Sequence, residues 1–114
     1  MNGKRWNGKG KEYNYGKLIF EGEYLNGKRN GKGKEYNKYD ELLFEGEYLK
    51  GKRNGKGKEF NRYGKLFEGE YINGERNGKG KEYNIYGQLI FEGGYINDER
   101  NGKCKEYDNT GMKF

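Results

Sequence analysis

Residues 20–36 read FEGEYLNGKRNGKGKEY, and this stretch decides the fold. Its first five residues alternate an aromatic or glycine with a glutamate, the period-two pattern of a β-strand with two different faces. Its last five residues, 32–36, form a second short run of the same kind. The segment between them carries two Asn-Gly pairs, the strongest short signal for a hairpin because both residues tolerate positive φ. The stretch therefore predicts an antiparallel β-hairpin.

The same hairpin recurs along the whole chain. The string NGKGKEYN, with small variations, begins at Asn7, Asn30, Asn54, Asn77 and Asn101, and FEGEY begins at Phe20, Phe44, Phe67 and, as FEGGY, at Phe91. The connections between units are too short for a parallel crossover, so we expect antiparallel pairing throughout. Architectures with a fixed internal period are built from units that contact only their neighbours.

The unit resembles the MORN repeat (membrane occupation and recognition nexus). The family's signature is an aromatic, any residue, Gly, any residue and an aromatic, followed by a glycine-studded stretch, as residues 20–33 show. The resemblance implies an all-β protein with one single-layer, elongated, twisted antiparallel sheet of tandem hairpins, about 10 strands in this chain at two per repeat. We expect one domain, 1–114, with a partial repeat at 1–19 and full repeats at 20–43, 44–66, 67–90 and 91–113.

Glycine explains how one layer can be stable. Gly22 lies between Phe20 and Tyr24 on one face and leaves a gap that an aromatic ring of the neighbouring strand can cover. The substitution Gly46→Val should therefore damage the sheet. Trp6 reads as an insertion in the first unit and is a candidate cap for the edge strand.

The other face carries charge. Glu21 and Glu23 fall on one strand and Lys32 and Lys34 on its partner, and later units repeat the arrangement. Opposite charges across strands stabilise a sheet, and a slipped register would place like charges together. We interpret these rows as a solvated ladder that fixes the register.

Composition sets the protein class. Mean hydropathy is −1.46, which alone would favour disorder, but 12 Tyr, 6 Phe and 1 Trp recur at fixed positions. The single Cys104 excludes an intramolecular disulfide framework and fits a reducing compartment. No segment approaches the roughly 20 apolar residues of a membrane-spanning helix. We expect a cytoplasmic protein, at most peripheral at a membrane or the cytoskeleton.

Catalysis has little support. The sequence contains no His and no Ser, so Cys104 has no base to activate it. The paired glutamates recur in nearly every unit, as scaffold residues do. Without His or a Cys cluster no metal site is indicated, and the glycine-lysine pieces lack the features of a phosphate loop. We expect neither enzyme activity nor a cofactor.

Protein binding is the first functional hypothesis, including association with further copies of the chain. A single sheet leaves two faces and open edges that can pair with another strand. The resemblance implies a scaffold, often a homodimer. The expected partner groove is the aromatic face with its row of tyrosines, Tyr24, Tyr48, Tyr71 and Tyr95.

Binding to acidic phospholipid membranes is the alternative, because the net charge is +6. Basic residues near an anionic surface each contribute about 1 kcal/mol. Glu75 and Glu99 interrupt the basic row in the later units, and evenly interleaved glutamates make nucleic acid an unlikely partner. The candidate anion-binding residues lie at the hairpin turns: Lys28, Arg29, Lys52, Arg53, Arg76 and Arg100.

Overall fold

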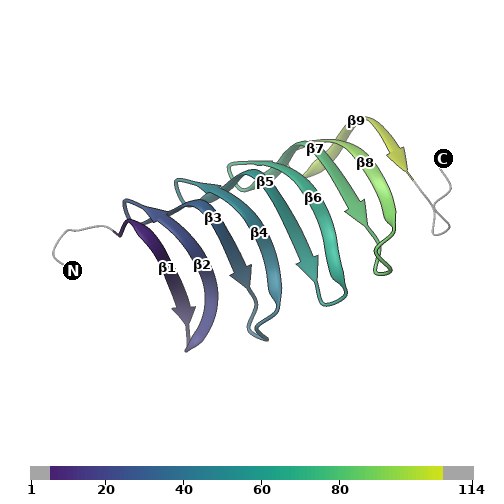
Figure 1. Ribbon diagram of the computed structural model, residues 1–114. Coiled ribbons are helices and arrows are strands. Elements are labelled where there is room, and N and C mark those ends of the chain that lie inside the picture. The colour runs from purple at the N-terminus through teal and green to yellow at the C-terminus, as the bar shows by residue number, and fades with distance from the viewer. Residues whose placement is uncertain (1–5, 107–114) are drawn as a thin grey trace.

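One antiparallel sheet forms the molecule. The computed structural model describes residues 6–106, and the side chains of residues 6–101. No helix occurs in this range, and each strand pairs with the strands before and after it in the chain (Figure 1). The all-β, single-layer prediction is confirmed. The strands are β1 (Gly8–Asn14), β2 (Lys17–Leu25), β3 (Lys28–Tyr36), β4 (Leu42–Leu49), β5 (Lys52–Asn61), β6 (Gly64–Ile72), β7 (Glu75–Tyr83), β8 (Leu89–Ile96) and β9 (Glu99–Glu106).

The sheet is long and shallow. Its principal extents are 58 × 29 × 17 Å, and the strands are bowed across the long axis (Figure 1). The pairing is wholly local, which is the arrangement of a linear repeat protein.

Tight turns join the strands. Between β2 and β3, Asn26 and Gly27 have φ values of 52° and 78°, as a type I′ turn requires. The second Asn-Gly pair, Asn30-Gly31, is not part of the turn. Gly31, with φ of 101°, lies within β3 where its register against β2 shifts, so this pair forms a β-bulge.

A glutamate side chain caps this bulge in the first three hairpins, whereas the fourth has Gly94 at that position. The Glu23 carboxylate accepts a hydrogen bond from the Lys32 amide at 2.7 Å, and Glu47 and Glu70 accept from the amides of Lys56 and Lys79 at 2.8 Å. The ladder interpretation gave these glutamates only a charge-pairing role. They also satisfy a backbone donor that the bulge removes from the strand pairing.

The core is a row of rings on one face. Phe20, Phe44, Phe67 and Phe91 have no exposed surface. A Cβ added to Gly33 would lie 2.4 Å from the Cζ of Phe20 on the neighbouring strand, so a ring occupies the gap at this glycine. At Gly22, where we expected such a ring, the nearest atoms are the Lys32 carbonyl oxygen and the Gly33 Cα, at 2.5 and 2.6 Å, and then the ring of Phe20 on the same strand. Tyrosine rings stand edge-on between the phenylalanines, as at Phe20 and Tyr48, whose centroids are 5.1 Å apart.

Trp6 is not an insertion. Its carbonyl accepts from the Gly27 amide at 2.8 Å, as the Arg29 carbonyl does from Gly51 at 2.9 Å, so Trp6 occupies the position of Arg29 in its repeat. The indole N–H donates to the Lys9 carbonyl of the edge strand β1 at 2.9 Å.

Candidate functional site

The tyrosine row that we expected to receive a partner belongs to the core. Tyr48, Tyr71 and Tyr95 are 4%, 2% and 2% exposed, and Tyr24 is half-buried. Each hydroxyl donates a hydrogen bond to a glutamate on the preceding strand: the acceptors are Glu12, Glu35, Glu59 and Glu82. These rings therefore hold repeats together, and the aromatic face is no open groove.

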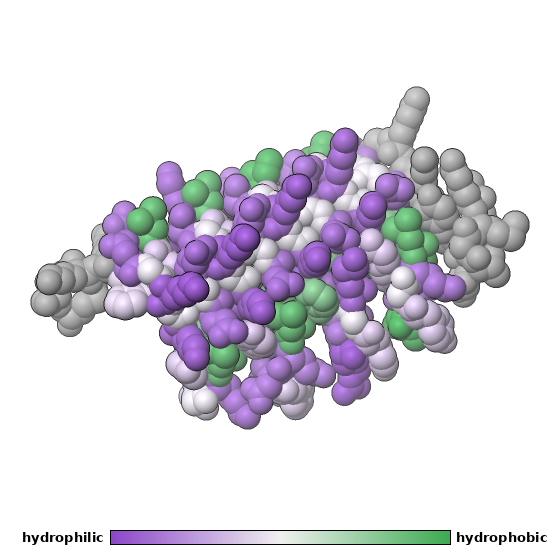
Figure 2. Space-filling view, in the orientation of Figure 1, coloured by the Kyte–Doolittle hydropathy of each residue, from purple (hydrophilic) through white to green (hydrophobic). Residues whose placement is uncertain are grey.

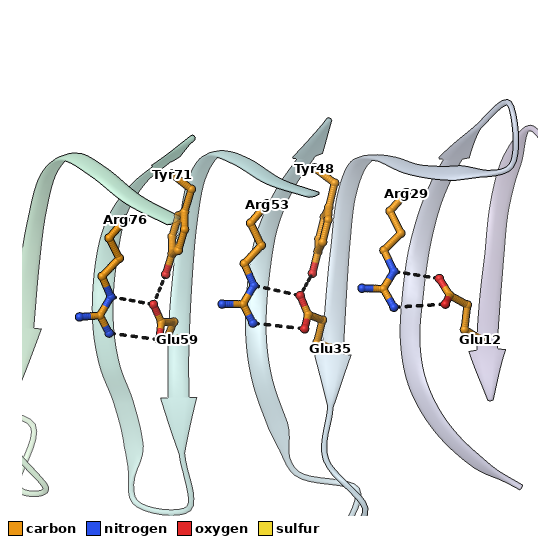
Figure 3. A network of polar contacts seen from close by, with 8 residues as sticks. All are labelled: Glu12, Arg29, Glu35, Tyr48, Arg53, Glu59, Tyr71 and Arg76. Carbon is orange, nitrogen blue, oxygen red and sulfur yellow. Dashed lines mark hydrogen bonds and ion pairs between the residues drawn. The ribbon is translucent and has the colours of Figure 1, made fainter. Parts of the chain in front are cut away.

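The arginines have a similar role. Arg53 donates to Glu35 through Nε at 3.0 Å and Nη2 at 3.2 Å (Figure 3). Its guanidinium also lies 4.1 Å from the centroid of the Phe44 ring. Each such set of a glutamate, an arginine and a tyrosine is called here a Glu–Arg–Tyr cluster. The clusters are Glu12–Arg29–Tyr24, Glu35–Arg53–Tyr48, Glu59–Arg76–Tyr71 and Glu82–Arg100–Tyr95.

This geometry corrects the expected basic stripe at the turns. The arginine follows the turn by one residue, and the alternation of the strand directs it to the aromatic face, opposite a tyrosine such as Tyr24 or Tyr48. There the guanidinium forms a bidentate ion pair with a glutamate and stacks on a phenylalanine ring. Of the candidate anion-binding residues, Lys28, Lys52 and Arg100 are exposed, and Arg100 is paired with Glu82.

The clusters shift the ionisation of their members. Burial acts to raise the pKa of Glu35, but the hydrogen bonds from Arg53 and Tyr48 outweigh it and hold that pKa below its ordinary value. Burial, and then the hydrogen bond to Glu35, raises the pKa of Tyr48. The carboxylate is therefore stabilised as an anion and the phenol as the neutral donor.

The opposite face contains the one long groove among the described residues, and it spans all nine strands. Its floor is backbone at paired glycines, such as Gly22 with Gly33 and Gly46 with Gly57. Figure 2 shows this face as a pale band running the length of the molecule between rows of hydrophilic side chains. We call it the charged groove.

The walls of the charged groove alternate in sign from strand to strand. In register, Lys34 lies between Glu21 on β2 and Glu45 on β4, and Lys58 lies opposite Glu45 on the next strand. The Lys34 Nζ is 3.8 Å from a Glu45 carboxylate oxygen. Lysines on odd strands and glutamates on even strands thus confirm the predicted charge pattern, at the roughly 4.8 Å spacing of neighbouring strands.

Apolar side chains border both long sides of the charged groove. On the turn side, Leu25 continues the alternation of Glu21 and Glu23 and is 51% exposed. On the other side, the Tyr36 hydroxyl donates to Glu21 at 2.7 Å, and burial together with this bond raises the pKa of Tyr36 to about 12. A partner in the groove would meet charge at the centre and hydrocarbon at the sides.

The candidate site consists of charged side chains above glycine backbone, with apolar side chains at its borders. In the range that the structure describes, no group of three or more His, Cys, Asp or Glu residues could hold a metal ion. Every buried side-chain nitrogen or oxygen there has a hydrogen-bond partner. The candidate nucleophile Cys104 lies outside the described side chains.

A single sheet of tandem hairpins with one continuous groove defines a linear repeat protein that presents a surface for binding. The chain belongs to the MORN repeat family: the family model matches residues 20–39, 44–61, 67–84 and 91–113. This family consists of non-enzymatic repeat scaffolds, whose repeats generally act as protein or membrane interaction modules. A search of curated proteins found no match to the chain. Within residues 6–106 no helix is long and apolar enough to cross a membrane.

The sequence contained the signal for the groove, but we interpreted it as register alone. The charges of residues 21, 23, 32 and 34 share one face, and the residues between them on the other face are glycines or take part in the bulge. This pattern predicts a groove whose floor is exposed backbone and whose sides are long charged side chains.

Proposed function

We propose that this chain is a non-catalytic scaffold that binds a helical segment of a partner protein in the charged groove. The observation that carries the proposal is the continuous alternation of lysine and glutamate across the strands.

The balance of charge favours a protein over a polyanion. The described residues lining the groove include eight lysines and seven glutamates, so it is almost neutral and offers no unbroken positive path. Phospholipid head groups and nucleic acid both need such a path. Because the arginines are paired with glutamates in the clusters, only a few lysines at the turns are left to bind an anionic membrane.

The spacing favours a helix of mixed charge. Residues three or four apart on a helix are separated by about 4.5–6 Å along its axis, close to the roughly 4.8 Å between strands. A helix whose acidic and basic residues alternate every three or four positions can therefore place opposite charges against successive strands. One flank of the helix would contact the border of the groove at Tyr36, on the side away from the two-residue turns.

Fluorescence anisotropy with a designed helical peptide of alternating Glu and Lys tests this proposal. The full chain should bind it, and neutralising Lys56, Lys58, Lys79 and Lys81 to Gln should weaken binding roughly tenfold, since exposed ion pairs contribute about 0.2–1 kcal/mol each. A matched control changes four exposed basic residues outside the groove to Gln: Lys17, Lys38, Lys50 and Arg62.

Two results would contradict the proposal. One is equal affinity of the groove variant and the control for the peptide. The other is stronger binding to phosphatidylserine vesicles than to the peptide, which would support the membrane alternative.

A further inference from the structure

The exposed edge of the sheet at the two-residue turns carries a regular apolar row. Each even strand ends in an aliphatic residue: Leu25, Leu49, Ile72 and Ile96 are 51%, 48%, 50% and 49% exposed. Figure 2 shows hydrophobic side chains at intervals along the upper edge, where Figure 1 places the turns from β2 to β3 and from β4 to β5. We call this edge the turn rim. It lies beside the charged groove, not within it.

A charged residue stands beside each aliphatic of the turn rim, and its sign changes halfway along the molecule. Across the hairpins, Leu25 pairs with Lys28 and Leu49 with Lys52, whereas Ile72 pairs with Glu75 and Ile96 with Glu99. Within the described range, none of these four charged side chains forms an ion pair with another residue.

The turn residues themselves strengthen this polarity. The first two turns contain no acidic residue and the last two contain no basic residue. Counting each turn with the first residue of the strand that follows it, the first turn carries Lys28 and the second carries Lys50 and Lys52. The third carries Glu75, and the fourth carries Asp98 and Glu99.

We propose that the turn rim is a self-complementary interface through which two copies of this chain pair side by side in opposite directions. A two-fold axis midway between the second and third turns places the first turn against the fourth and the second against the third. Leu25 then meets Ile96 of the second copy, and Leu49 meets Ile72. The inference extends the scaffold role by naming one partner, a second copy, at a surface separate from the groove.

The repeat geometry brings all four positions together at once. Successive rim residues are two strands apart, roughly 10 Å, in both copies, so reversing one copy preserves the register. Each positive turn faces a negative turn, with Lys28 opposite Glu99 and Lys52 opposite Glu75.

The charge order also selects the antiparallel arrangement. Aligned in the same direction, the two rims would oppose lysine to lysine and glutamate to glutamate, which disfavours association. The paired rims leave the groove of each copy open, so a dimer would present two grooves running in opposite directions.

Sedimentation equilibrium of the full chain with charge-reversed variants tests the interface. The wild type should form a dimer that weakens with added salt. Two variants give one sign to the four positions that pair, 28, 52, 75 and 99. They are Lys28→Glu with Lys52→Glu, called the all-acidic rim, and Glu75→Lys with Glu99→Lys, called the all-basic rim. Each should self-associate at least about tenfold more weakly. Mixing the two variants should restore a dimer, and so should combining all four substitutions in one chain.

A matched control reverses Lys38 and Arg62 to Glu, which changes the net charge as much as the all-acidic rim does but at the opposite turns. The control should dimerise like the wild type. The inference is overturned if the wild type stays monomeric at high concentration, if the all-acidic rim dimerises normally, or if the mixture does not associate. Peptide binding measured on the same samples separates the two proposals, because a monomer that still binds the peptide contradicts the rim interface alone.

Discussion

At the scale of single residues, stability depends on side chains that join one repeat to the next. Glu35 comes from β3, and its partners Tyr48 and Arg53 come from β4 and β5. One carboxylate therefore links three strands. The guanidinium in turn covers a phenylalanine ring that has no exposed surface, so the polar and aromatic contacts depend on each other.

Glu59→Ala should lower the free energy of unfolding by about 3 kcal/mol, because it leaves the Arg76 charge and the Tyr71 hydroxyl without their acceptor. The side chains of Glu59 and Arg76 are only 20% and 19% exposed, so water replaces the lost contacts poorly. Urea denaturation measures the change. Glu99→Ala, at the exposed rim, should alter stability by less than about 0.5 kcal/mol, and equal losses at both positions would contradict this account.

Gly46→Ala should be at least as damaging, at about 3 kcal/mol or more. An added Cβ would lie 2.6 Å from the Cα of Gly57 and from the Lys56 carbonyl oxygen, so it meets backbone of β5 as well as a ring. This revises the sequence argument for Gly46→Val, which considered only ring packing. Thermal unfolding followed by circular dichroism measures the loss, with Lys58→Ala as a control that should retain nearly wild-type stability.

At the scale of one strand pair, the bulge determines which residue the arginine lies opposite. Between Gly22 and Tyr24 of β2, β3 accommodates two extra residues, Gly31 has positive φ, and the Glu23 carboxylate bonds the next amide. Past this irregularity, Arg29 stands opposite Tyr24 on the aromatic face.

Glu47→Ala should loosen one bulge without unfolding the sheet. The Lys56 amide loses its 2.8 Å acceptor, and we expect its hydrogen exchange to accelerate roughly fivefold, corresponding to about 1 kcal/mol of local opening. The Lys79 amide, which bonds Glu70, serves as the internal reference and should exchange as in the wild type. Uniform acceleration at both amides would indicate global destabilisation instead.

The sequence predicted what depends on period and turn chemistry. The alternation in residues 20–24 indicated strands, Asn26-Gly27 indicated a turn, and the glycines indicated ring packing, all of which the structure confirms. It did not predict the Glu–Arg–Tyr clusters. Glu35 and Tyr48 belong to different repeats, and the bulge that aligns Arg53 with them moves the pairing of the residues before it by two positions. The residue pattern of one strand does not show which residues of another repeat it will lie opposite, nor where the register will shift.

At the scale of the whole molecule, the clusters predict a stability maximum between acid and alkaline limits. The pKa of each cluster glutamate is lowered, so their contribution is present above the unfolded value near 4.3 and is lost as pH falls through the folded values. The pKa of each cluster tyrosine is raised, so its contribution is lost as pH rises above about 10. Melting temperatures from pH 2 to 12 should fall at both ends, and a flat profile would contradict this.

The linear architecture makes whole repeats removable. Deleting residues 44–66 joins Leu43 to Phe67, which recreates the Leu-Phe sequence found at residues 43–44 and 66–67. Glu35 then faces Tyr71 and Arg76, which occupy the positions of Tyr48 and Arg53, so every cluster at the junction can re-form. We expect a folded sheet two strands shorter, with a smaller denaturant m-value because less surface is exposed on unfolding. Removing residues 44–55 instead takes out a half-unit, places two strands of the same charge side by side, and should abolish cooperative unfolding. If both deletions unfolded equally, the repeats would not be interchangeable, and the sheet would depend on contacts beyond nearest neighbours.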